Sequence, residues 1–106
     1  MNVLSRPKLR TFYQSKPAYA KHAKAFESWY KIARKAEWNA FADAKASLGQ
    51  TDVATNTRSG ATVTIFDIGG NKYRIATLID YARQTVLITH VMTHAECDQS
   101  KWKREI

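Results

Sequence analysis

The sequence lacks the residues on which disulfide-bonded, zinc-binding and membrane-spanning proteins depend. Its 106 residues include a single cysteine, Cys97, which excludes an intrachain disulfide and a zinc site built from several cysteines. No stretch approaches the ~20 apolar residues of a membrane span, and the basic N-terminus is not followed by the apolar core of a secretory signal. Four glycines and two prolines leave no low-complexity linker. We therefore expect one soluble, intracellular (cytoplasmic) domain over residues 1–106.

Acidic side chains are also scarce. Lys and Arg number 17 against nine Asp and Glu, which gives a formal net charge of +8. Residues 1–50 carry ten basic and three acidic side chains, a net charge of +7, whereas residues 51–106 carry seven and six, a net charge of +1. A domain that is basic in one half attracts polyanions. Charge alone does not distinguish a nucleic acid from an anionic membrane, or from no special partner.

The first half of the chain has the apolar spacing of helices. A helix that begins at Ser15–Pro17 would present apolar side chains at intervals of four, three, four and three residues on one face, namely Tyr19, Ala23, Phe26, Tyr30 and Ala33. A second helix would carry Trp38 and end with Gly49 as a left-handed cap. The helical part then covers about 17–48.

The second half has the pattern of strands. After a polar loop over 50–60, β-branched runs predict strands that are joined by short turns, at 61–68, 73–81 and 86–92. Short connections indicate an antiparallel meander over about 61–93, followed by a helical or irregular tail. An edge strand near 2–5 or 8–13 is also possible. The fold class is α+β, with two N-terminal helices on a small, mostly antiparallel sheet.

The turn at residues 69–72 offers the first chemical site. If Gly70 and Asn71 are its central residues, Asp67 faces Arg74 across the hairpin. One interpretation is a cross-strand ion pair with a purely structural role. The other is that Arg74 points from an open sheet face toward a phosphate, which a guanidinium binds with two parallel hydrogen bonds.

The last strand offers two histidines. Alternation predicts that one strand face carries Val86, Ile88, His90, Met92 and His94. His94, at the strand end, is the better candidate for proton transfer, since the ordinary histidine pKa is about 6.5. His90 fits a structural residue, and Cys97 fits a half-buried side chain rather than a nucleophile. A metal site is a further alternative without a recognised ligand spacing, and would use His90, His94, Glu96 and Asp98.

Two segments at the right separation carry a family resemblance. Residues 65–74 (IFDIGGNKYR) and 91–98 (VMTHAECD) resemble the HigB toxins of bacterial toxin–antitoxin pairs, a branch of the RelE-like superfamily. Trp38-Asn39 and Trp102-Lys103 fit the same pattern. The resemblance implies a RelE-like fold and an endoribonuclease that needs no metal or other cofactor. Such an enzyme cuts messenger RNA, usually on the translating ribosome, and an antitoxin from the same operon holds it inactive.

The resemblance also implies roles for individual residues. The RNA supplies its ribose 2′-hydroxyl as nucleophile, Arg74 holds the phosphate, and His94 moves protons. Further contacts to RNA are expected from Asn71, Lys72, Lys101 and Lys103, although the last two also fit a solvated basic tail. Docking to ribosomal RNA would use Lys21, Lys24, Lys31 and Lys35, which also fit a solvated helix face.

One departure from the family pattern leaves alternatives open. Cys97 stands where many relatives have tyrosine, which puts any role of that tyrosine in doubt. A non-catalytic RNA-binding module and a degenerate toxin that only binds its antitoxin are the two alternatives. The expected partners are mRNA, the ribosome and the antitoxin, with operator DNA contacted only through the antitoxin and no membrane partner.

Overall fold

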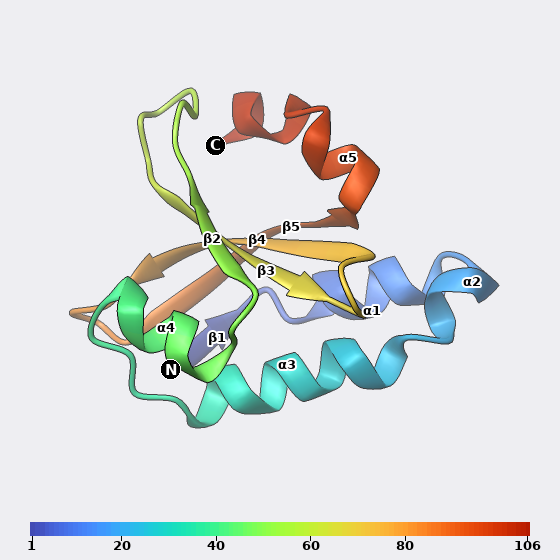
Figure 1. The fold of residues 1–106 in the computed structure, drawn as a ribbon, viewed down its shortest axis with the longest axis horizontal. Coiled ribbons are helices and arrows are strands. Elements are labelled where there is room, and N and C mark those ends of the chain that lie inside the picture. Colours follow the sequence, from blue (N-terminus) through green and yellow to red (C-terminus); the bar gives the residue numbers. More distant parts are fainter.

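A five-stranded sheet lies between two helical layers. In the computed structural model, which describes residues 1–106, helices α1 and α3 lie on one side of the sheet and the C-terminal segment lies on the other (Figure 1). The elements follow one another as β1 (Asn2–Leu4), α1 (Pro7–Gln14), α2 (Pro17–Ala20), α3 (Ala23–Lys35), α4 (Phe41–Ser47), β2 (Thr51–Ala54), β3 (Val63–Ile68), β4 (Tyr73–Asp80), β5 (Thr85–Thr93), α5 (His94–Asp98) and the 3-10 helix η1 (Lys101–Glu105). The helices are all too short and too polar to span a bilayer.

The sheet confirms the predicted α+β class. Its strand order is β1-β5-β4-β3-β2, and every pair of neighbours is antiparallel except β1 and β5. The three-strand meander is therefore confirmed, with β1 and β2 added at its two edges. The expected edge strand near 2–5 exists as β1, while the alternative at 8–13 lies in helix α1.

The main core lies between the sheet and the N-terminal helices. Phe26 and Trp29 of α3, together with Trp38, are buried against Phe66 and Ile75 of the sheet. The ring centroids of Trp29 and Phe66 are 5.3 Å apart, and those of Trp38 and Phe66 are 5.7 Å apart. Burial of these large aromatic side chains gives the helical layer most of its apolar contact area.

The opposite sheet face has a smaller core under the C-terminal segment. Trp102 of η1 is 4% exposed and packs with Val63, Ile65, Ala76 and Met92. A capping box begins α5 immediately after β5, because the Thr93 hydroxyl accepts from the Glu96 amide and the Glu96 carboxylate accepts from the Thr93 amide. The tight change from strand to helix places the first residue of α5 beside the end of the sheet.

The helical half departs from the prediction at three points. The expected first helix is interrupted at residues 21–22, which separate α2 from α3. Trp38 lies between α3 and α4, where it is 2% exposed and its indole N–H donates to Ser47 at 3.0 Å. Gly49 does not have positive φ, since the C-cap of α4 is Leu48. Burial of the Trp38 ring outweighs its helical spacing, which is a tertiary effect that local periodicity does not contain.

The strands depart from the prediction at two points. β2 lies inside the expected loop 50–60 and pairs with β3, because a partner strand distant in sequence satisfies its backbone. A bulge also shifts the β4–β5 register: Ala76 pairs with His90 but Thr77 pairs with Ile88. Ile88 consequently faces the helices whereas Met92 faces the C-terminal segment, so the expectation of one continuous face was wrong.

Candidate active site

The β3–β4 hairpin has the predicted register. Asp67 pairs with Arg74 and Ile68 with Tyr73, which leaves residues 69–72 as the turn. The central residues Gly70 and Asn71 have φ values of +64° and +78°. These left-handed conformations suit glycine and asparagine, and they fold the turn back so that Asn71 contacts Arg74.

Arg74 is nearly enclosed by the turn. Its Nε lies 3.0 Å from Oδ1 of Asp67, and both side chains are about one-tenth exposed. Its Nη1 donates to the main-chain oxygens of Asn71 at 3.2 Å and Tyr73 at 3.1 Å, and Nη2 donates to the Asn71 amide oxygen at 2.6 Å. The predicted ion pair is thus present. One hydrogen of Nη2 is left without a protein partner.

His94 reaches the same turn from the other direction. As the first residue of α5, its backbone N–H donates to Lys72 O at 2.9 Å, which anchors α5 to the hairpin. The ring Nδ1 lies 3.3 Å from Asn71 O and Nε2 lies 3.0 Å from Oδ2 of Asp98. The Asn71 carbonyl oxygen therefore contacts both Arg74 and His94, and the structure brings the two predicted catalytic residues together.

The partners of His94 match a charged imidazolium. A peptide carbonyl and a carboxylate only accept hydrogen bonds, so both ring nitrogens donate only when the ring is protonated. The Asn71 partner belongs to the main chain and is fixed by the turn. The Asp98 side chain is 69% exposed and lies one helical turn along α5, so a ligand can displace it from Nε2 more easily.

Burial changes the other two titratable groups of the site. It raises the pKa of Asp67 above its ordinary value, while the positive charges of Arg74 and His94 act in the opposite direction. Burial also raises the pKa of the Cys97 thiol, against a smaller opposing effect of Arg74. A thiol with a raised pKa stays protonated near neutral pH, so Cys97 is unsuited to act as a nucleophile.

The remaining predicted RNA contacts lie around this site or near it. Lys72 is exposed on the hairpin turn, and Lys101 is exposed at the start of η1. Lys103 is half-buried, with its Nζ 5.8 Å from the centroid of the Trp102 ring. Its charge lowers the pKa of Cys97 slightly, which places it close enough to influence the site.

His90 lies away from the site. Its Nε2 is 2.9 Å from a carboxylate oxygen of Glu105, and its ring is 6.3 Å from that of Trp102. His94 instead faces Asp98. No three histidine, cysteine or acidic side chains gather in a geometry that could hold a metal ion. The metal alternative built on His90 and His94 was therefore wrong.

The predicted docking lysines are exposed on or beside α3. They stand on the solvent side of the helix, except for one in the turn before it, and none has a carboxylate within 4 Å; they are Lys21, Lys24, Lys31 and Lys35. His22, at the start of α3, packs against the Tyr73 ring with centroids 5.1 Å apart. The first two lysines are thus at the hairpin end of the molecule.

Sequence reasoning did not assign Asp98 as the partner of His94. The signal was the spacing of four residues, which places two side chains on one helical face only if the helix begins at His94. The role of the Asn71 carbonyl carries no sequence signal, because every residue has one. Only the approach of α5 to the turn creates that contact.

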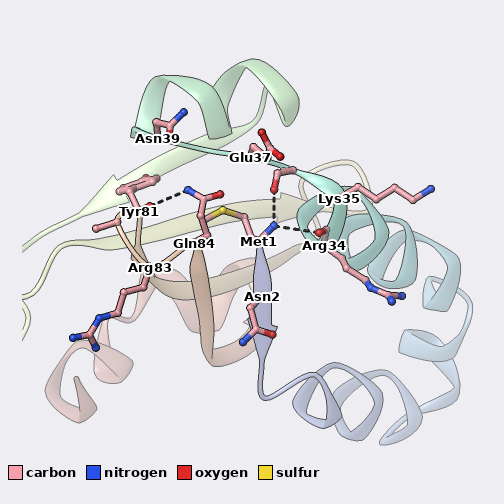
Figure 2. Close-up of a pocket in the computed structure, with 11 residues that line it drawn as sticks. Met1, Asn2, Arg34, Lys35, Glu37, Asn39, Tyr81, Arg83 and Gln84 are labelled. Atoms are coloured by element: carbon pink, nitrogen blue, oxygen red, sulfur yellow. Dashed lines mark hydrogen bonds between the residues drawn. The ribbon is translucent and has the colours of Figure 1, made fainter.

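The largest hollow lies at the opposite end of the sheet and has a different character. It encloses about 710 Å³ between the end of α3 and the β4–β5 turn. The Met1 ammonium donates there to the carbonyls of Arg34 at 3.2 Å and Ala36 at 2.5 Å, a favourable position for a cation at a helix C-terminus. Figure 2 shows Lys35 and Arg83 extending away from Met1. No histidine lines this hollow, so it offers no proton-transfer site.

Comparison with known families identifies the chain. Residues 22–100 match the family described as HigB toxin, a RelE-like toxic component of a toxin–antitoxin system. The chain belongs to the HigB toxin family. The matched region runs from the start of α3 to the end of α5 and includes Asp67, Asn71, Arg74, His94 and Asp98. A search among curated proteins finds no match. As a member of the HigB family, the protein is the toxin of such a pair and has an antitoxin as its partner.

Proposed function

We propose that this HigB-family protein is an endoribonuclease that cleaves messenger RNA on the translating ribosome and so inhibits translation and growth. The observation that carries the proposal is the convergence of Arg74 and His94 on one carbonyl oxygen, at 3.2 and 3.3 Å. A guanidinium and an imidazole this close can contact a single phosphodiester group. Family membership supports the same conclusion.

The chemistry needs no nucleophile or metal ion from the protein. The ribose 2′-oxygen attacks the adjacent phosphorus, a P–O2′ bond forms and the P–O5′ bond breaks, which leaves a 2′,3′-cyclic phosphate and a 5′-hydroxyl. Arg74 stabilises the negative charge that develops on the phosphoryl oxygens through its free Nη2 hydrogen. His94 donates the Nε2 proton to the departing 5′-oxygen once RNA displaces Asp98. The freed Asp98 carboxylate accepts the proton of the 2′-hydroxyl.

Asn71 positions both reacting side chains. Its carbonyl holds Nδ1 of His94, which leaves Nε2 as the transferring atom, and its carbonyl and amide oxygens orient the Arg74 guanidinium. Lys72 on the turn, with Lys101 and Lys103 of η1, contacts phosphates on either side of the scissile bond. The exposed lysines of α3 contact ribosomal RNA, since unpaired cations on one surface release counterions from a polyanion when they bind it.

The test is primer extension on mRNA from cells induced for this protein, together with the His94→Gln variant. We expect cuts that carry 5′-hydroxyl ends with the wild type and a loss of about 100-fold or more with the variant, since general acid catalysis contributes 10²–10⁴-fold. Asp98→Asn should lower the rate as well. Cuts of equal frequency in the His94→Gln variant would refute the assigned role.

One observation favours a second function, a degenerate toxin that retains only antitoxin binding. The Arg74 guanidinium is already engaged by Asp67 and Asn71, and a thiol stands at position 97 where many relatives have a phenol. In that case the same experiment gives uncut mRNA and normal growth, whereas a complex with the antitoxin still forms.

A further inference from the structure

Three leucines form a row across the sheet on the face opposite the N-terminal helices. Leu4 of β1 pairs with Leu87 of β5, and Leu87 pairs with Leu78 of β4. Their sequence neighbours Val3, Val86 and Ile79 pack into the core on the helical side. Because successive side chains of a strand point to opposite faces, the three leucines point to the other side.

This leucine row (Leu4, Leu87 and Leu78) is only partly covered. Leu4 is 42% exposed, and Leu78 and Leu87 are half-buried. The C-terminal segment covers the sheet further along, where Trp102 packs on Ala76 and Met92. A hollow of about 370 Å³ adjoins the row, lined in part by Leu78, Leu87 and Ile106, with Lys8 among the lining residues.

An uncovered row of this kind is unusual for an antiparallel sheet. The solvated face of such a sheet normally carries polar side chains. An exposed apolar patch on a small soluble domain marks an interaction site more often than a scattered surface leucine does. RNA gains little from contact with leucine side chains, so the row serves a partner other than the substrate.

We infer that the leucine row is the docking surface for the antitoxin, which places there a segment with apolar side chains flanked by carboxylates. The inference rests on the antitoxin pairing of the HigB family. Charge selects this occupant: the chain carries +8, and Lys8 stands beside the row. A second copy of the chain would bring two strongly positive molecules together, whereas an acidic segment is attracted.

The docking surface is separate from the proposed catalytic pair. Arg74 and Leu78 are four residues apart on β4, and the C-terminal segment with Trp102 lies over Ala76 between them. Antitoxin binding at the leucine row therefore does not require contact with Arg74 or His94. A variant of the row should lose antitoxin binding and keep RNA cleavage.

The experiment measures the Kd of the purified antitoxin encoded beside this gene, by titration calorimetry, for the wild type and for Leu4→Glu. We expect Kd to rise about 30-fold or more, because the variant places a charge at the centre of an apolar contact and opposite acidic side chains. The control is Ile32→Glu, a residue 39% exposed on α3, on the other side of the sheet, for which Kd should stay within about threefold. A Leu4→Glu Kd within about threefold of the wild type overturns the inference.

A second measurement covers the case in which Leu4→Glu does not fold. Hydrogen exchange of the wild type should slow over residues 78–87 when the antitoxin is added, and unchanged exchange there overturns the inference. So does sedimentation that shows a wild-type dimer at micromolar concentration, because a second copy would then occupy the row. Failure of the wild type to cut mRNA would refute the proposed nuclease without changing these binding results.

Discussion

Removal of Arg74 separates a structural ion pair from a catalytic group. In the structure Arg74 makes three hydrogen bonds through Nη1 and Nη2 and pairs with Asp67, whose side chain is 9% exposed. Arg74→Ala would leave that carboxylate buried without a counter-charge, which costs about 3 kcal/mol in unfolding free energy. Without its guanidinium to hold the phosphate, the cleavage rate should also fall about 100- to 1000-fold. The single variant therefore mixes two effects.

A second substitution resolves them. Asp67→Asn removes the unpaired charge, so the double variant Asp67→Asn/Arg74→Ala should recover several degrees of Tm, at about 4–8 °C per kcal/mol for a domain near this size. It should not recover cleavage, because the guanidinium is still missing. Asp67→Asn alone keeps Arg74 and its hydrogen bonds to Asn71, and should retain most of the activity.

The assays are thermal unfolding followed by circular dichroism and cleavage of mRNA followed by primer extension. Recovery of both Tm and cleavage in the double variant would refute the reasoning, since Arg74 would then act only by neutralising Asp67. Full activity of a folded Arg74→Ala variant would refute it as well.

Three further predictions concern stability and RNA binding. Burial alone would raise the pKa of Glu27, but hydrogen bonds from Arg6 and Tyr13 outweigh it and lower the pKa below 4.5; Glu27→Gln should therefore reduce Tm above about pH 5, and the difference from wild type should vanish as the pH falls through the folded-state pKa. Gly69→Ala, at φ +66° with a Cβ 3.2 Å from the Tyr73 ring, should lower unfolding free energy by more than Gly70→Ala, whose φ is similar but whose Cβ meets open space, and equal losses in denaturant titrations would exclude a steric contribution. Neutralising the exposed lysines should weaken ribosome binding and reduce its salt dependence by up to about one unit of slope for each phosphate that the protein no longer neutralises, and an unchanged slope in sedimentation assays would argue against docking through Lys21, Lys24, Lys31 and Lys35.

Local pattern was sufficient where the interacting residues are close in the chain. The hairpin register that pairs Asp67 with Arg74 follows from two residues that tolerate positive φ between two β-branched runs, and the structure has that register. Pro17 likewise begins a helix as expected, because its fixed φ suits a first turn. The family resemblance on residues 65–74 and 91–98 is confirmed by the match over residues 22–100.

Contacts between distant segments were beyond the sequence. The strand β2 forms only because β3 offers a free edge, the burial of Trp38 ends a helical pattern early, and the bulge near His90 turns Met92 to the other face. Each of these depends on a partner that no local window contains.

The sequence by itself determined that this is a small basic α+β domain with an arginine beside a hairpin turn and a histidine at the end of the last strand, since these follow from composition, alternation and turn chemistry. Only the tertiary structure decided that the two residues meet. β5 must run back along β4 for Lys72 to bind the first amide of α5, and only then does the Asn71 carbonyl lie between Arg74 and His94. The leucine row depends in the same way on β1 joining β5, a pairing of segments some eighty residues apart that brings Leu4 beside Leu87.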